Sequence, residues 1–157
     1  MARLKSILGF VNWPSFLLAG LVANIAKAIA FLLVGKSLVI NGAQVLPDAE
    51  PLVQDLVGAG IFIFSGQVFY ALVYIFFFHN AKGFASNKLW DLIVKALAVG
   101  FAEAFLSIVV MPYSGDVSWL GAMKTLFGYV AFAFGMVFVY KSPAEKQAKE
   151  QAKQQDG

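Results

Sequence analysis

The chain contains four separate apolar segments, each long enough to cross a membrane as a helix. A bilayer core needs roughly 20 apolar helical residues. The segments run over about residues 16–40, 56–78, 89–111 and 118–140. Because lipid offers no hydrogen bonds to backbone N–H and C=O groups, segments of this kind must be helical. We therefore predict an all-α, polytopic membrane protein with a bundle of four transmembrane helices in one domain, residues 1–140.

The composition favours the same class of protein. Hydrophobic residues make up 60% of the 157 residues and charged residues 13%, whereas soluble domains carry about 25% charged residues. The sequence has no cysteine and one histidine, His79, which excludes disulfides, zinc–thiolate centres and intrachain His-rich metal sites. We predict no metal, no cofactor and no enzymatic centre. The net charge of +3 gives no indication of nucleic-acid binding.

The charges between the apolar segments predict the orientation. Basic residues occur before the first segment, between the second and third, and after the fourth: Arg3, Lys5, Lys82, Lys88, Lys141, Lys146, Lys149 and Lys153. The two other loops carry acidic residues and no basic ones: Asp48, Glu50, Asp55 and Asp116. Because basic loops stay in the cytoplasm, we expect both termini there, with the chain in the inner or plasma membrane.

Both ends of the chain are expected to lie outside the bilayer core. Residues 2–11 place apolar side chains on one helical face and predict a short interfacial helix on the inner leaflet. Residues 141–157 form a charged tail, in which Ser142 and Glu145 have the spacing of a capping box. Because so short a helix is marginal in water, we expect a frayed, solvated tail. The alternative is a helix that docks through a stripe of alanines.

Two ionisable residues fall near the middle of predicted spans: Lys27 in the first and Glu103 in the third. A lone charge at the bilayer centre costs at least about 2.5–3.5 kcal/mol. Both spans run from inside to outside, so the two charges lie at similar depth and are expected to form a partnered pair. Further polar residues share the inward helical faces. The predicted buried polar cluster comprises Lys27, Glu103, Asn24, Gln67, Tyr70 and Ser107.

Three interpretations of this pair remain open. Lys27 and Glu103 could form a salt bridge that sets the helix register, with little net stabilisation. They could form a proton- or substrate-handling site, in which the ammonium tunes the carboxylate. Each could also bind a group on another subunit. Lys36, Lys95 and Lys124 lie nearer the span ends, where a lysine stem can carry its ammonium to the headgroups.

Glycines predict where the helices pack. They recur every seven residues in the fourth span, and one lies a turn before Glu103 in the third; the predicted helix-packing residues are Gly100, Gly121, Gly128 and Gly135. A seven-residue repeat keeps one stripe facing a partner in a left-handed crossing. That partner is either a neighbouring span or a second copy of the chain.

Two functions are compatible with these features. Short loops, packing stripes and a lack of catalytic groups favour an accessory or assembly subunit, or a homo-oligomeric scaffold, whose partners are the bilayer and an unidentified membrane protein. The midplane charges favour a small proton- or ion-coupled transporter or flippase. In size and span count the chain is similar to GtrA-type flippases and small multidrug transporters. It carries no motif diagnostic of either, and its membrane carboxylate is in the third span, whereas that of the small multidrug transporters is in the first.

Overall fold

A computed structural model of the chain describes residues 10–36, 45–79, 81, 87–110 and 118–155. Within these residues all regular structure is helical, and four helices are long and apolar enough to cross a membrane. This confirms the prediction of an all-α chain with four membrane-length helices. The predicted interfacial helix lies almost entirely outside the described residues.

The first span is helix α2, Trp13–Leu33. It begins where the Asn12 side chain accepts a backbone hydrogen bond from the first turn. Pro14 lies in that turn, where its missing N–H leaves no bond unmade. The helix ends before Gly35, whose φ of +64° suits glycine. It thus begins before the predicted span of 16–40 and ends well before residue 40.

The second span switches from α-helical to π-helical hydrogen bonding at two points along its length. It consists of four segments: α4 (Pro51–Phe64), the π-helical η1 (Ser65–Tyr70), α5 (Ala71–Val73) and the π-helical η2 (Tyr74–Phe78). The helix begins at Pro51 and not near residue 56, because proline is well suited to a first turn. π-Helical turns are rare and often occur at functional sites. The predicted cluster residues Gln67 and Tyr70 both lie in η1.

The third and fourth spans are α6 (Lys88–Val110) and α7 (Trp119–Val139), and helix α8 (Pro143–Gln155) follows them. A reciprocal pair of hydrogen bonds caps α8. The Ser142 N–H donates to Oε2 of Glu145 at 2.8 Å, and the Glu145 N–H donates to Oγ of Ser142 at 3.3 Å. This is the geometry of a capping box.

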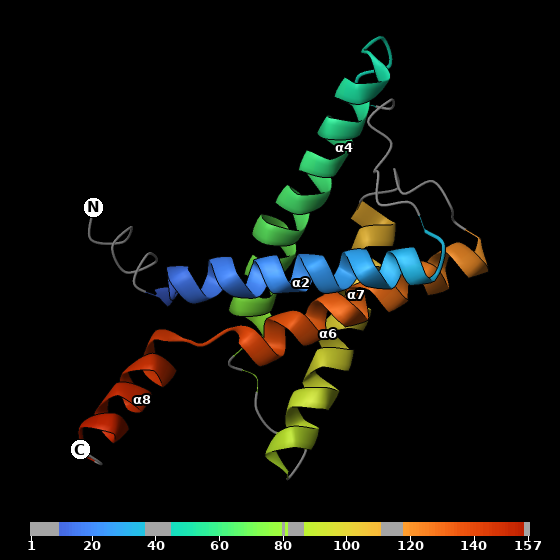
Figure 1. The fold of residues 1–157 in the computed structure, drawn as a ribbon. Coiled ribbons are helices and arrows are strands. Elements are labelled where there is room, and N and C mark those ends of the chain that lie inside the picture. The colour runs from blue at the N-terminus through green and yellow to red at the C-terminus, as the bar shows by residue number, and fades with distance from the viewer. Residues whose placement is uncertain (1–9, 37–44, 80, 82–86, 111–117, 156–157) are drawn as a thin grey trace.

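Helix α7 is central to the arrangement, because it packs against both α2 and α6. Figure 1 shows α2 and α7 side by side and antiparallel, with α4 and α6 crossing them steeply. The π-helical segments of the second span contact α2 and α6, whereas α4 extends away from the other helices. The start of α2 and helix α8 lie at the same end, where the Lys141 N–H donates to Oγ of Ser15 at 2.7 Å.

Glycines allow close contact between these helices. A Cβ at Gly135 of α7 would lie 2.6 Å from Cα of Ala23 in α2, and one at Gly100 of α6 would lie 2.6 Å from a backbone Cα of α7. A Cβ at Gly128 would overlap an aromatic ring of α2. Gly121 is buried near the start of α7. Within this chain, the glycines of α7 thus allow close approach of α2.

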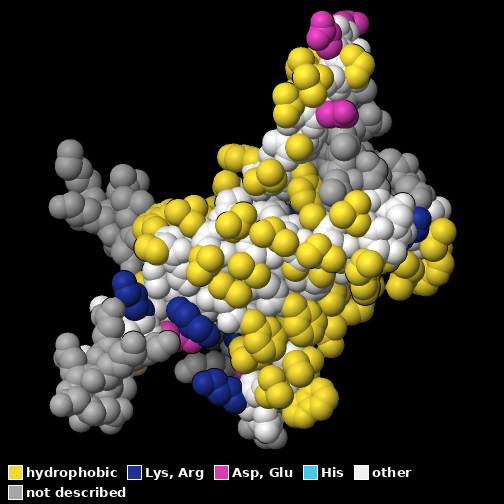
Figure 2. All heavy atoms as spheres, viewed as in Figure 1, with side chains coloured by type: hydrophobic (Ala, Val, Ile, Leu, Met, Phe, Trp, Pro, Cys, Tyr) yellow, Lys and Arg dark blue, Asp and Glu magenta, His cyan; other side chains and the backbone are white. Residues whose placement is uncertain are grey.

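The surface is apolar around the helices and charged at the ends (Figure 2). Basic side chains gather at the end that holds the start of α2 and helix α8, and a basic side chain also appears at the far end of α2, which Lys36 follows in the chain. Acidic side chains lie at the opposite tip of α4, which corresponds to Asp48, Glu50 and Asp55 at the start of that helix. An apolar belt between two polar ends is what a bilayer requires.

Candidate functional site

The Lys27 ammonium is enclosed by aromatic rings. Lys27 of α2 is only 1% exposed. Its Nζ lies 3.9 Å from the ring centre of Phe62, 5.3 Å from those of Tyr129 and Phe132, and 5.9 Å from that of Tyr70. The negative face of an aromatic ring attracts a cation, by about 2 kcal/mol when the cation is desolvated. We call these four rings, which come from α4, η1 and α7, the aromatic cage.

Glu103 of α6 contributes a wholly buried carboxylate. Its exposed fraction is 0%, and neither of its oxygens accepts a hydrogen bond. The carboxylate interacts electrostatically with Lys27, but in the described part of the chain no direct ion pair joins these two residues. The two charges are therefore near each other and yet held apart.

Three hydroxyl groups lie next to this pair. Tyr70 of η1, Ser107 of α6 and Tyr129 of α7 are all buried, and the rings of the two tyrosines lie 4.7 Å apart. Their hydroxyls interact with one another and with the charge of Glu103, although the Tyr70 hydroxyl makes no hydrogen bond of good geometry. The structure therefore brings together Lys27, Glu103, Tyr70 and Ser107 of the predicted cluster.

Asn24 and Gln67, also predicted to belong to the cluster, form a separate contact between α2 and η1. The Gln67 amide donates to the Phe16 carbonyl at 3.2 Å and lies over Gly20, which has no Cβ to obstruct it. The Asn24 amide donates to the Gly20 carbonyl at 3.0 Å, and its own carbonyl oxygen lies against Gly66 without a hydrogen bond. These polar groups hold two helices together beside the charged pair.

Three of the four cage residues were not predicted from the sequence: Phe62, Tyr129 and Phe132. A usable signal exists in the fourth span. Thr125, Tyr129, Phe132 and Met136 recur at helical spacing and are all buried. Because two of these four carry hydroxyl groups, this face of α7 could have been expected to meet the polar interior.

Two lysines near the span ends bind protein groups, although headgroups were expected to be their partners. Lys95 is 7% exposed, and its ammonium donates to the His79 carbonyl at 3.0 Å. Lysines commonly bind the last carbonyls of a helix in this way. The Lys36 ammonium donates to the Thr125 hydroxyl of α7.

A second polar contact joins α8 to the end of the second span. His79 follows η2, and its Nε2 lies 3.6 Å from Oε2 of Glu145. Its Nδ1 lies 3.3 Å from the Tyr74 hydroxyl. Its ring packs edge-on against that of Tyr140, with centroids 4.8 Å apart. Helix α8 is therefore attached to the spans at its first turn through Glu145, whereas Ala144 and Ala148 of the alanine stripe expected in the docking alternative are exposed.

The titration of His79 reports on this contact, because Glu145 lies beside the ring. The imidazole signal is unambiguous, because the chain has no other histidine. Burial lowers the pKa of His79 below its ordinary 6.5, Glu145 raises it, and Lys95 and Lys141 lower it. A folded protein that favours the neutral imidazole loses stability as the pH falls below about 6.5. We therefore expect the imidazole NMR signal to titrate with a midpoint below 6.5.

The Glu145→Gln variant tests the cause of that midpoint. Loss of the carboxylate removes an attraction to the protonated ring, so the midpoint should fall further. Glu50→Gln is the control, because Glu50 precedes the second span and His79 follows it. This variant should leave the His79 midpoint unchanged. A wild-type midpoint above 6.5, or one that does not respond to Glu145→Gln, would contradict the contact.

The site offers an ammonium, a carboxylate and hydroxyl groups in an interior shielded from water. These groups can take up and release protons. Among the described residues, no group of three or more His, Asp or Glu side chains is placed to hold a metal ion. Comparison with protein-family models, curated proteins and solved structures gives no match to the chain.

Proposed function

We propose that this chain is a small proton-coupled membrane transporter or flippase, and that Lys27 and Glu103 form its proton-handling site. The observation that carries the proposal is the burial of both charged groups without a direct ion pair. Intramembrane charges are costly and commonly mark proton or substrate pathways. A salt bridge that served only to set helix register would place the two groups in direct contact.

The pair has two states with the same net charge. In one state Lys27 is an ammonium and Glu103 a carboxylate. In the other, a proton has moved from Nζ to a carboxylate oxygen, and both groups are neutral. The neutral state avoids the desolvation of two charges, whereas the charged state gains the attraction of the cage and of the opposite charge. A proton or ion that arrives from one side shifts the balance between the two states.

The proposed orientation places both termini in the cytoplasm and the chain in the inner or plasma membrane. It is supported by the separation of charges along the molecule. The end that holds the start of α2 and helix α8 carries lysines, and the tip of α4 carries acidic residues (Figure 2). Basic residues are retained on the cytoplasmic side.

Proton flux into liposomes that contain the purified full chain tests the function. A pH-sensitive dye inside the liposomes reports flux under an imposed pH gradient. We expect Glu103→Gln to lower the flux by about 100-fold, the loss typical of a removed proton-transfer group. The exposed Glu50 provides a matched control, because Glu50→Gln makes the same chemical change outside the spans. Flux that does not depend on Glu103 would overturn the proposal.

A second function, an accessory subunit or homo-oligomeric scaffold, is favoured by a different observation. Helix α4 extends away from the other helices (Figure 1), and of its 14 residues only Gly58 and Phe62 are buried. Such a helix can be covered by a partner as well as by lipid. Native mass spectrometry of protein extracted from its own membrane separates the two functions. A stoichiometric foreign subunit supports the accessory function, and a homo-oligomer without other chains supports a self-sufficient transporter.

A further inference from the structure

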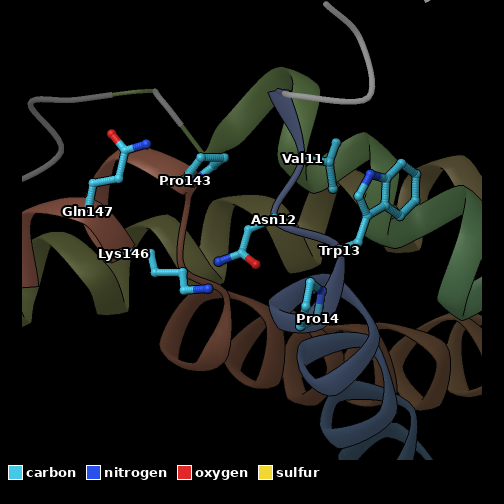
Figure 3. A pocket seen from close by; sticks show the side chains of 7 residues that line it. All are labelled: Val11, Asn12, Trp13, Pro14, Pro143, Lys146 and Gln147. Carbon is cyan, nitrogen blue, oxygen red and sulfur yellow. The ribbon is translucent and has the colours of Figure 1, made fainter. Parts of the chain in front are cut away.

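A hollow lies between the start of α2 and the first turns of α8 (Figure 3). Its volume is about 360 Å³, at the lower end of the volumes of ligand pockets, about 300–1,000 Å³. Asn12, Trp13 and Pro14 line one side, and Pro143, Lys146 and Gln147 line the other. The hollow is separate from the Lys27–Glu103 site and has no part in the proposed proton transfer.

The two sides of the hollow are held together by hydrogen bonds. The Lys141 N–H donates to Oγ of Ser15 at 2.7 Å. The Tyr140 side chain interacts with the backbone of Asn12. Both bonds join the segment before α8 to the start of α2. These contacts fix the two sides of the hollow relative to each other, which reduces the entropy lost when a ligand binds between them.

The polar groups that line the hollow suit an anion. Lys146 brings an ammonium, Trp13 an indole N–H, and Asn12 and Gln147 each bring an amide NH₂. The side-chain oxygen of Asn12 accepts a hydrogen bond from the Ser15 N–H in the first turn of α2. The other polar group of the Asn12 side chain is its amide NH₂, which is a donor. Among the described residues, no acidic side chain lines the hollow. Two prolines and the indole ring provide apolar walls between these donors.

The location of the hollow points to a lipid. Trp13 opens the first span and is 41% exposed, and tryptophan favours the headgroup region of a bilayer. In the following turns of α2, Leu17, Leu18 and Leu21 are more than half exposed, so acyl chains can lie along this helix. We infer that the hollow binds the headgroup phosphate of an anionic phospholipid, whose acyl chains extend along α2. Anionic lipids are characteristic of the cytoplasmic leaflet, where the proposed orientation places this end.

Lipid titration of the full chain in detergent tests this inference. Phosphatidylglycerol and phosphatidylcholine with identical acyl chains are added, and native mass spectrometry counts the bound lipids. We expect one saturable site with about a tenfold preference for phosphatidylglycerol, since charge-assisted hydrogen bonds favour the anionic headgroup. Lys146→Gln should remove most of that preference. Gln147→Trp, which fills the hollow at constant net charge, should remove the saturable site.

Lys88→Gln is the matched control. It removes the same charge from an exposed residue at the start of α6, on the same side of the spans but outside the hollow. Its preference should equal that of the wild type. Equal losses in Lys88→Gln and Lys146→Gln would show attraction to general surface charge and overturn the inference. So would equal binding of the two lipids, or binding of free glycerol phosphate as tightly as the lipid.

Discussion

The Gly135→Ala substitution is expected to destabilise the fold by about 3 kcal/mol, the upper end of the usual cost of overpacking. The added Cβ would lie 2.6 Å from Cα of Ala23. Because this neighbour is a backbone atom, it cannot turn aside, and α2 and α7 would have to separate. These two helices share the most extensive contact in the described chain. Unfolding in mixed micelles of increasing dodecyl sulfate content, followed by circular dichroism, gives the free energy.

Two other glycines provide controls for this prediction. A Cβ at Gly60 meets nothing within 4 Å, so Gly60→Ala should stabilise the helix by about 0.5–1 kcal/mol. A Cβ at Gly128 overlaps the Phe31 ring, which can rotate, so Gly128→Ala should give an intermediate loss. If Gly135→Ala were as stable as Gly60→Ala, the close approach of α2 and α7 would be contradicted.

The number of membrane-length helices could be predicted because the length of an apolar run is a local property of the sequence. The ends of the helices were harder to predict. The apolar run of the first span continues to Ile40, and hydropathy gives no sign that Gly35 adopts a positive φ. The π-helical segments η1 and η2 were not predicted either. They lie where the second span meets α2 and α6, so their signal is in the packing and not in the local sequence.

In the candidate site too, some features follow from the local sequence and others depend on how the helices pack. The position of Lys27 and Glu103 near the middle of their helices follows from counting residues along each apolar segment, and both are buried within the protein. The crossing angles of the helices cannot be counted in this way. They decide that Lys27 faces four rings and that Gln67 reaches α2 at Phe16, away from the charged pair.

Replacing Lys27 and Glu103 together is expected to harm the fold less than replacing Lys27 alone. Lys27→Met leaves a buried carboxylate without an opposite charge, which costs roughly 3–5 kcal/mol. Glu103→Gln leaves an ammonium that the cage still stabilises, so its loss should be smaller. The double variant removes both charges and should be as stable as the wild type or more stable by about 1–4 kcal/mol. A double-mutant cycle from the same unfolding assay measures the coupling.

The folded double variant also separates a structural pair from a functional one. If Lys27 and Glu103 served only to hold α2 and α6 in register, restored stability would bring restored proton flux. A proton-handling pair predicts the opposite result, because methionine and glutamine neither take up nor release a proton at these positions. We therefore expect the double variant to unfold like the wild type and to conduct no protons in liposomes. A stable double variant with wild-type flux would assign the pair to the architecture of the fold, and the scaffold function would then be the better account of the chain.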